Sequence, residues 1–559
     1  MSSILNVPVV SAVKRWEHAR DLLSSALAVY LDSCLSLDVV LQRGCANASG
    51  IVSGMNSALD TSHPDMALQL AQSTSILARA RNRLASPINF LPEEVLYQIF
   101  LNVVYAPENT NSPMNKSLRA IYGSLHKLLA VCSIWRNIAI SRGTLWDIIP
   151  AADIPVRSQK LGLSLDRSGG RALHLVAIAT ADGPPCLFKT ITENNVRLRT
   201  LNVQSAYSNF ITPVIAELLR GGVPDQLSEL FMRCSPPKYS QPPRISNCVV
   251  EDASIEQADF NKLISSLSAL RLSGIQLDWK TTNNVFSDRL VEFHIHKVGL
   301  GNSDTAMLDL LLALSSATKL RDLKIVDVRA YRISAQSSSL TPPIVVFPKL
   351  QSFLLQDVCF NVLEFFLLGI APGSYHMTLA LSDNSFRIGY SGGGMKKVSL
   401  AEVTQLITPV KVDTLSLPRG SIDDKAWLKG PDLRALLESV PKLKELKLHG
   451  WHFYEDFCDG LCPPPTSDPP FSGFPFQDLE FLQLTAVRIR DQERFRNIPV
   501  ALSPRTMVFN GSIKEEGKSW VQLTEDDEVV NWLRNNVPGF RLVDAKYDAA
   551  ALKIDQWRL

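Results

Sequence analysis

The feature that most constrains this chain is a short apolar pattern, Leu-x-x-Leu-x-Leu, that recurs through most of its length. Alternate residues of a β-strand point to the same side, so the last two apolar positions of each copy face one core. Helix-like runs separate the copies, such as residues 305–314 and 433–440. The pattern therefore predicts repeating strand and helix units that each bury an apolar face only against their neighbours. The middle apolar positions of the clear copies are Leu201, Leu230, Leu270, Phe293, Leu323, Phe353, Leu415, Leu446 and Leu482.

The spacing of these copies predicts one that the leucine pattern does not show. Phe293, Leu323 and Phe353 follow one another at intervals of 30 residues, whereas the next interval, to Leu415, is 62 residues. Since this interval is about twice the period of the repeat, a further strand is expected inside it. We place this strand at the alternating apolar positions Tyr375, Met377, Leu379 and Leu381.

A strand and a helix in units of this length resemble the leucine-rich repeat. That family usually has an Asn or Cys three residues after the last strand leucine, which satisfies backbone groups of the turn. This chain has apolar residues there instead, so no asparagine ladder can form and the turns must be capped in another way. The positions are Ile275, Val298, Val328, Val358, Trp451 and Val487. We expect an irregular leucine-rich-repeat-like α/β solenoid over residues 151–515 and a C-terminal capping segment over 516–559, with a closing helix and a last strand.

Residues 1–87 predict an N-terminal helical hairpin or coiled coil. Apolar residues recur there at the three- and four-residue steps of a helix face, from Met66 to Leu84 and again from Trp16 to Cys34. One interpretation is a coiled-coil dimerisation arm. The other is that these helices pack on each other or on the next domain, because Ser73 and Ala80 weaken the seam. The sequence leaves both open.

Residues 88–150 combine two apolar helical segments. The first is Leu91-Pro92-x-Glu94-Val95-Leu96-x-x-Ile99-Phe100, in which Pro92 suits a first helical turn and the acidic residues suit the positive helix end. After a polar loop around 107–116, a second segment runs from Leu125 to Ile138 with Val131-Cys132-x-x-Trp135-Arg136, and Leu145-Trp146 closes the region. Together these motifs resemble an F-box, in the form common in large fungal (basidiomycete-type) families. The alternative is a helical subdomain without a special partner.

The F-box resemblance implies a function and a docking surface. It implies that the chain docks on the Skp-type adaptor of a cullin-RING (SCF) ubiquitin ligase and that the repeat region holds a protein substrate. Catalysis would then be proximity supplied to other subunits, with no catalytic residue in this chain, so the chain is expected not to be an enzyme. An adaptor-bound scaffold outside ubiquitination is equally compatible. The adaptor-binding residues that the resemblance implies are Leu91, Pro92, Val95, Leu96, Ile99, Phe100 and Trp135.

The outward residues of the repeat strands are the candidate substrate surface. Asp322 and Lys324 on one strand, and Glu445 and Lys447 on another, should face the concave side. Both signs of charge stand side by side there. This mixture suits a mixed-charge protein epitope better than a uniform polyanion.

Two constellations could carry chemistry. Gly389-Tyr390-Ser391-Gly392-Gly393 has the Gly-x-Ser-x-Gly spacing of a hydrolase nucleophile, with Asp423 and His449 following. The short segment before it and the delayed helix after it favour a glycine-rich hairpin turn instead. His449, His452, Cys458 and Cys462 match no familiar zinc spacing. We therefore expect no metal and no cofactor, and Ser391 hydrolysis is the remote enzyme alternative.

The charge and composition exclude several classes of protein. The chain has 559 residues with 57 Lys+Arg against 55 Asp+Glu, so its net charge of +2 gives no field that would attract a nucleic acid. Asp21, Asp32 and Asp38 interrupt the N-terminal apolar stretch, so neither a signal peptide nor a membrane span is expected. Nine cysteines without a Cys-x-x-Cys pair suggest reduced thiols. We expect an intracellular protein, cytoplasmic or nuclear.

Overall fold

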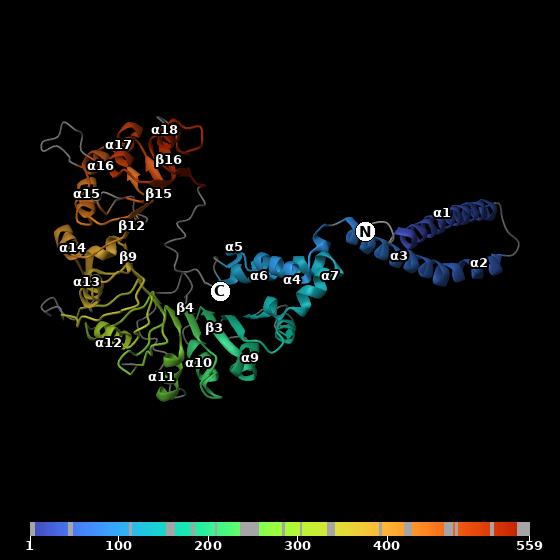
Figure 1. The fold of residues 1–559 in the computed structure, drawn as a ribbon, viewed down its shortest axis with the longest axis horizontal. Helices are drawn as coiled ribbons and strands as arrows, with labels where there is room; N and C mark the ends of the chain where they lie inside the picture. The colour runs from blue at the N-terminus through green and yellow to red at the C-terminus, as the bar shows by residue number, and fades with distance from the viewer. Residues whose placement is uncertain are drawn as a thin grey trace. The chain divides into compact units, whose positions relative to one another are not determined.

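The protein is a mixed α/β structure with a mostly parallel sheet and a helical N-terminal region in this computed structural model (Figure 1). The chain divides into two compact units, residues 1–96 and 97–559. The domain limits expected at residues 87, 150 and 515 stay predictions. The structure describes residues 6–42, 48–85, 87–110, 114–152, 162–179, 185–206, 210–234, 256–281, 285–301, 304–332, 341–390, 394–418, 427–462, 473–475, 479–514 and 519–544.

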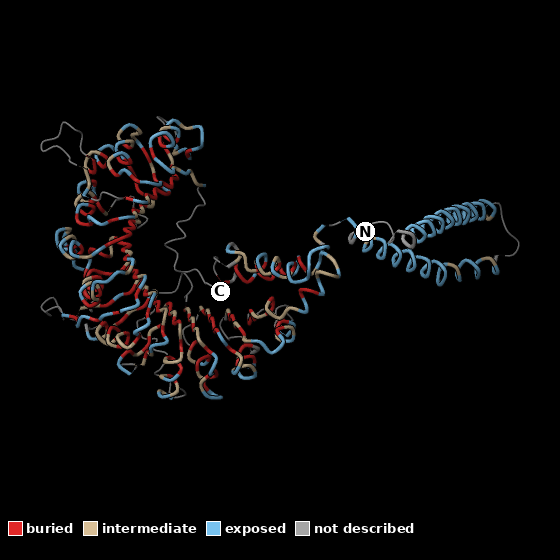
Figure 2. Tube along the Cα trace, in the orientation of Figure 1, coloured by how far each residue is buried: buried red, intermediate tan, exposed pale blue. Residues whose placement is uncertain are grey.

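The first unit is helical. Tyr30 of α1 contacts His63 at the start of α3, with the hydroxyl 2.9 Å from a ring nitrogen and the two rings edge to face. None of the described side chains between residues 10 and 85 is buried (Figure 2). Both predicted helical segments are therefore helices, but they form no buried core. The elements are α1 (Asn6–Gln42), α2 (Ala48–Ser57), the π-helical turn η1 (Ala58–Ser62), α3 (His63–Ala85) and η2 (Pro87–Phe90).

Helix α1 contradicts the expectation that no segment is long and apolar enough to span a membrane. Its residues Val10–Gln42 are long and apolar enough for a span by length and composition, with a best-window mean hydropathy of 1.5. The expectation weighed uninterrupted apolar runs, whereas the mean tolerates Asp32 and Asp38. The core helix of a soluble protein and a signal sequence meet the same criteria.

The region of the F-box resemblance folds into short helices. Its second apolar segment is not one helix, because the chain is extended at Cys132 and a new helix starts at Ser133. Helix α6 also begins earlier than predicted, so the polar connection is shorter. Leu125 and Leu128 are buried on α6, and Ile138 is buried on α7. The apolar segment is therefore divided between two helices. The elements are α4 (Glu93–Val104), α5 (Pro107–Thr110), α6 (Met114–Val131), α7 (Ser133–Ser141) and η3 (Gly143–Trp146).

The repeat strands lie side by side in one sheet, each paired with its neighbours along the chain. Strand β9 fills the long interval, and its Met377 and Leu379 are fully buried, which confirms the predicted strand. All pairs are parallel apart from β16–β17 and the separate hairpin β10–β11. In order, the sheet contains β1 (Ile148–Ala152), β2 (Leu173–Ala179), β3 (Leu198–Ser205), β4 (Glu229–Cys234), β5 (Ala269–Ser273), β6 (Glu292–His296), β7 (Asp322–Val326), β8 (Ser352–Gln356), β9 (His376–Ala380), β12 (Thr414–Pro418), β13 (Glu445–His449), β15 (Phe481–Ile489), β16 (Thr506–Lys514) and β17 (Trp520–Gln522).

Helices connect the strands and cover the outer side of the curved sheet (Figure 1). Their apolar faces and the inward strand residues form one continuous core from Ile149 to Val537. The closing helix α18 and the last strand β18 confirm the predicted C-terminal elements. Bounds are α9 (Pro185–Asn194), η4 (Asn195–Arg197), α10 (Ile211–Leu219), α11 (Gln257–Ser266), α12 (Asp304–Ser315), α13 (Phe360–Gly369), η6 (Asp383–Phe386), β10 (Arg387–Gly389), β11 (Met395–Lys397), α14 (Leu400–Ile407), α15 (Gly430–Glu438), β14 (His452–Phe453), α16 (Glu455–Leu461), α17 (Gln492–Leu502), α18 (Glu528–Asn536) and β18 (Phe540–Leu542).

The register of the sheet changes by two residues at β9. Phe353, a middle position of the repeat, pairs with Met377, whereas Leu415, the middle position of the next copy, pairs with Leu379. The sequence pattern treats all middle positions as equivalent, which is wrong across this strand. Because side chains alternate with a period of two, such a shift keeps every apolar side chain on the core side.

The turns after the strands are capped by backbone geometry in place of an asparagine ladder. One residue directly after a strand, or at the bulge in β15, has a left-handed conformation with φ between 47° and 75°. The N–H of Gly274 donates to the carbonyl of His296 at 2.8 Å and that of Lys297 to the carbonyl of Val326 at 3.0 Å, each at the end of the next strand. The apolar residue that follows then turns into the core, where all six predicted positions are nearly fully buried. The left-handed residues are Gly274, Lys297, Asp327, Asp357, Gly450 and Ala486.

Candidate functional site

Helix α4 carries two apolar stripes, and only one of them is buried. Leu96, Phe100 and Val104 follow one another at four-residue steps and are 2%, 0% and 0% exposed. Val95 and Val103 lie on the adjacent side and are 42% and 43% exposed. The first stripe anchors the helix, and the second is exposed.

The residues implied for adaptor binding are therefore divided. Leu91, Pro92 and Val95 are exposed, whereas Leu96 and Phe100 are buried and support the helix. The remaining two, Ile99 and Trp135, are partly buried, and the Trp135 ring lies 4.9 Å from that of Phe100. The exposed stripe, which we call the outer stripe, consists of Leu91, Val95, Ile99 and Val103 at four-residue steps. Ile99 is partly buried, and the other three are exposed.

Further apolar residues around this region are exposed, although the sequence pattern does not indicate their exposure. Phe90 is exposed before α4, Val103 continues the outer stripe, and Val131 and Ile140 are exposed on α6 and α7. The four-residue spacing could have identified Val103. Val131 and Ile140 could not be recognised because their exposure depends on the break between α6 and α7.

Two tyrosines, the partly buried Tyr105 and the buried Tyr122, connect this region to the segment that follows. The Tyr105 hydroxyl donates to the Thr144 carbonyl at 3.1 Å, and the Tyr122 hydroxyl donates to the Ile148 carbonyl at 2.7 Å. Burial raises the pKa of both phenols well above the usual value, so they stay protonated donors. The Trp146 indole donates to Ala139 at 2.8 Å, which anchors the closing Leu-Trp motif. These bonds hold α4 to α7 in a fixed arrangement.

The outward face of the sheet carries the predicted substrate residues. Lys324 pairs with Asp322 at 2.7 Å, and Lys447 pairs with Glu445 at 2.9 Å, each with its neighbour two positions away on the same strand. All four side chains are partly exposed. Leu446, in contrast, is fully buried, which confirms the predicted alternation on β13.

Around Asp322 these pairs extend into a charge cluster across β4 to β7, which we call the β4–β7 cluster. His294 Nε2 lies 2.9 Å from Asp322 Oδ2 and 3.1 Å from Glu292 Oε1. Arg271 donates two hydrogen bonds to Glu292, at 2.6 and 2.8 Å. Burial lowers the pKa of His294, so its neutral form is favoured despite the two carboxylates. The cluster consists of Glu229, Arg271, Glu292, His294, Asp322 and Lys324.

Three of these groups could hold a metal ion by proximity alone. Among the described residues, Glu292, His294 and Asp322 are the only group of three or more such donors that gather within 4.8 Å. Arg271 contacts both carboxylate oxygens of Glu292, and Lys324 contacts Oδ2 of Asp322, whereas Asp322 Oδ1 is buried without a hydrogen-bond partner among the described residues. A divalent cation at this place would have to compete with both basic side chains. The arrangement is that of an ion-pair network rather than a metal centre.

The Gly-x-Ser-x-Gly segment around Ser391 does not lie in the structural context of a hydrolase nucleophile. Ser391 and Asp423 lie outside the described residues, but β10 and β11 on either side of the glycines pair antiparallel as a hairpin, as predicted. His449 contacts the Thr485 hydroxyl at 3.0 Å. The described context is therefore not the parallel strand and helix that a hydrolase elbow requires.

The cysteines of the second constellation are packed in the interior. Cys458 and Cys462 are buried, and burial raises the pKa of each thiol to about 12. This favours the thiol over the thiolate that binds metals. His452 contacts the Tyr454 hydroxyl at 3.0 Å.

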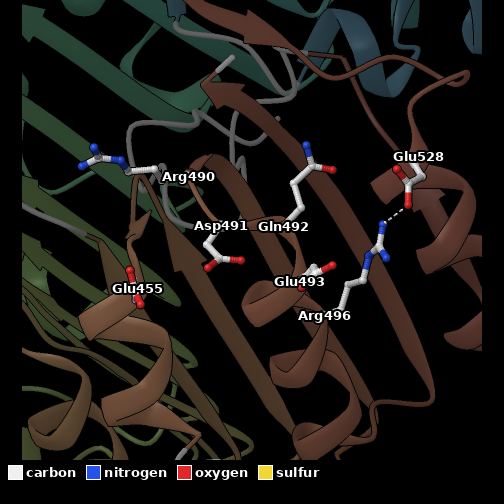
Figure 3. A pocket seen from close by; sticks show the side chains of 7 residues that line it. All are labelled: Glu455, Arg490, Asp491, Gln492, Glu493, Arg496 and Glu528. Atoms are coloured by element: carbon white, nitrogen blue, oxygen red, sulfur yellow. Dashed lines mark hydrogen bonds and ion pairs between the residues drawn. The ribbon is translucent and has the colours of Figure 1, made fainter. Parts of the chain in front are cut away.

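A polar hollow of about 520 Å³ lies at the start of α17 (Figure 3). Its charged lining includes Glu455, Arg490 and Glu493, and Arg496 pairs with Glu528 at 2.7 Å. The Asp491 side chain accepts from the backbone N–H of Arg494 and already caps the positive helix end. Carboxylates outnumber the arginines, so the hollow is not suited to an anion.

Comparison with protein-family models and with curated proteins found no match.

Proposed function

We propose that this chain is the substrate-receptor subunit of an SCF-type cullin-RING ubiquitin ligase. Residues 88–150 dock on a Skp-type adaptor and through it on a cullin. Residues 151–515 act as a leucine-rich-repeat-like solenoid that binds a protein substrate on its outward strand face. The chain itself performs no chemistry and raises the concentration of a substrate lysine beside the ubiquitin thioester.

The observation that supports this proposal best is the exposed apolar stripe on α4. A helix that is already anchored by one buried stripe gains nothing in stability from a second, solvent-exposed one. Leu91 and Val95 lie at its start, where the F-box resemblance implies adaptor contact. The opposed charges on the sheet face support a second, polar contact with a protein.

The test is a binding measurement between the full chain and a purified Skp-type adaptor. Removal of a buried interface anchor costs on the order of 2 kcal/mol, or about thirtyfold in affinity. We expect Val95→Asp to abolish binding, and Leu91→Ala with Pro92→Ala to do the same. The matched control is Gln98→Asp, which adds the same charge at an exposed polar position of α4. Normal adaptor affinity in Val95→Asp would remove the basis of the proposal.

A scaffold that acts outside ubiquitination would bind the adaptor as a receptor does, but its binding would not lead to ubiquitin transfer. Reconstitution with adaptor, cullin, RING subunit and charged ubiquitin-conjugating enzyme separates the two. A receptor should promote ubiquitin transfer to a co-purifying protein, and Val95→Asp should abolish that transfer. A scaffold should bind the adaptor without it.

A further inference from the structure

A bulge in β15 changes which of its side chains reach the outward face of the sheet. Ala486 has a left-handed conformation with φ 52°, and the register with β16 shifts between Leu484 and Val487. Leu484 and Val487 are both fully buried in the core, and Ile489 is buried beside them. Because side chains alternate along a strand, Arg488 between Val487 and Ile489 lies on the opposite, outward side.

Arg488 is held by an aromatic ring instead of a carboxylate. Its guanidinium lies over the Trp520 ring of β17, 5.4 Å from the ring centroid. The His452 ring of β14 lies 6.1 Å from the same indole ring, and its Nδ1 is 3.0 Å from the Tyr454 hydroxyl. A guanidinium stacked on a ring presents its N–H groups at the edge of one plane, which suits bidentate hydrogen bonds to an anion.

Two further basic side chains lie beside Arg488 on the outward face. Arg488 pairs with Ser512 of β16, and Lys514 pairs with Trp520. Lys514 follows Ser512 by two residues and Arg490 follows Arg488 by two, so both lie on the side of Arg488. Such neighbours are about 7 Å apart along a strand and about 5 Å apart across strands, close enough for three cations to meet one anion. We call Arg488, Arg490, Lys514 and Trp520 the β15–β17 patch.

The three cations of the patch have no ion pair among the described residues, whereas the arginines of α17 do. Glu493 is also without an ion pair in this part of the structure, but it lines the hollow at α17, and Figure 3 shows Arg490 extending away from it. The connection of residues 515–518 contains two glutamates and one lysine and lies outside the described residues. The pairs of α17 and its surroundings are Arg494 with Glu455, Asp459 and Asp491, and Arg496 with Glu528.

One fixed planar cation with two mobile cations beside it suits a phosphate group. A phosphorylated side chain carries about −1.5 to −2 charges near pH 7 and three acceptor oxygens, so it can bind several of these donors at once. A nucleic acid presents a row of phosphates and needs a longer basic surface. The adjacent strand β13 does not continue such a surface, because its Lys447 already pairs with Glu445. A protein segment with a phosphorylated side chain therefore fits the patch better.

We propose that the β15–β17 patch binds a phosphorylated serine or threonine of the protein substrate. This inference rests on the proposed function as a substrate receptor and adds the chemical class of the segment that is recognised. Arg488 binds the phosphate through bidentate hydrogen bonds, and Arg490 and Lys514 neutralise its remaining charge. Trp520 is a positioning residue, because it acts by holding Arg488.

The test is binding of the full chain to fluorescein-labelled libraries of nine-residue peptides, measured by fluorescence anisotropy. The libraries have a central phosphoserine, serine or glutamate, and their flanking positions are degenerate. The wild type should bind the phosphoserine library about tenfold more tightly than the serine library, which corresponds to about 1.4 kcal/mol. Equal affinity for these two libraries overturns the proposal. Equal affinity for the phosphoserine and glutamate libraries overturns it too, because a carboxylate would then suffice.

Substitutions assign the binding to the patch. Arg488→Glu should reduce the affinity for phosphoserine to that for serine, and Arg490→Gln with Lys514→Gln, at two exposed positions, should weaken it about tenfold. Trp520→Phe keeps a ring face and should bind within about threefold of the wild type, whereas Trp520→Leu should bind about tenfold more weakly. The matched control is Arg289→Glu, at an exposed arginine outside the patch. Normal phosphoserine binding in Arg488→Glu, or an equal loss in Arg289→Glu, overturns the proposal.

Two further measurements separate this inference from the proposed function and from nucleic-acid binding. Arg488→Glu should keep normal affinity for the adaptor, and Val95→Asp should keep normal affinity for the phosphoserine library. A wild type that binds the adaptor but does not prefer phosphoserine refutes only the β15–β17 patch. A single-stranded oligothymidylate of 12 nucleotides should not displace the phosphoserine peptides, and displacement at the same concentration would identify a nucleic acid as the ligand and overturn the proposal.

Discussion

Replacement of Gly274 by alanine should destabilise the repeat region through the turn after β5. Gly274 has φ +67°, and an added Cβ would lie 2.3 Å from the carbonyl oxygen of Cys234. That oxygen belongs to the backbone of β4 and cannot rotate away. The left-handed conformation costs an L-residue roughly 1–2 kcal/mol. Relief of the overlap disturbs the hydrogen bond from Gly274 to His296, which is worth about 1 kcal/mol. We expect a loss of about 3 kcal/mol.

Two matched variants separate the overlap from the backbone strain. Gly222 has φ +93° with nothing within 4 Å of an added Cβ, so Gly222→Ala should cost only the strain, about 1–2 kcal/mol. Lys297 has φ +53° at the equivalent turn after β6. Lys297→Gly removes this strain and adds about 0.5–1 kcal/mol of glycine entropy, so its net effect should be between neutral and about 1 kcal/mol stabilising.

The assay is urea unfolding of the full chain, followed by circular dichroism and compared at equal slope. The order of stability should be Lys297→Gly at or above the wild type, then Gly222→Ala, then Gly274→Ala. Equal midpoints for the two alanine variants would show that the close approach to β4 carries no cost. A clear loss of unfolding free energy in Lys297→Gly would show that the side chain of this turn residue stabilises the fold, which contradicts the expected relief of backbone strain.

Further predictions concern packing, pH and salt. Leu446→Ala should cost about 2–5 kcal/mol by forming a cavity, and Lys447→Ala almost nothing, as ranked by thermal melts. Burial alone would raise the pKa of Asp322, but hydrogen bonds from His294 and Lys324 outweigh it and hold the pKa below its usual range. Its stabilisation is then present above about pH 4 and lost as the pH falls toward the folded-state pKa, so Asp322→Asn should cost less stability in acid than at pH 7 in melts across that range. Rising salt should release a bound substrate before the adaptor from immobilised protein, and the reverse order would contradict this assignment of polar and apolar contacts.

The order and spacing of the repeat strands follow from the sequence alone. Leu446 and Leu448 face the core because side chains on a strand alternate, and this follows from local geometry. The strand at Met377 could be placed because Phe293, Leu323 and Phe353 recur every 30 residues and the next interval is about twice as long. The first F-box-like helix could also be predicted, since Pro92 and the acidic residues after it mark its start locally.

Which apolar surfaces are buried and which charges meet depends on tertiary packing. Phe100 and Val103 are both apolar on α4, but Phe100 is buried and packs against Trp135 of α7, whereas Val103 is exposed. Glu292, His294 and Asp322 come together because parallel strands align residues about 30 positions apart, and that pairing register also shifts at β9. The turns needed left-handed residues that composition does not reveal, since Lys297 and Asp327 adopt a conformation typical of glycine. Exposure, pairing register and turn conformation all depend on contacts between distant segments, which local sequence pattern does not specify.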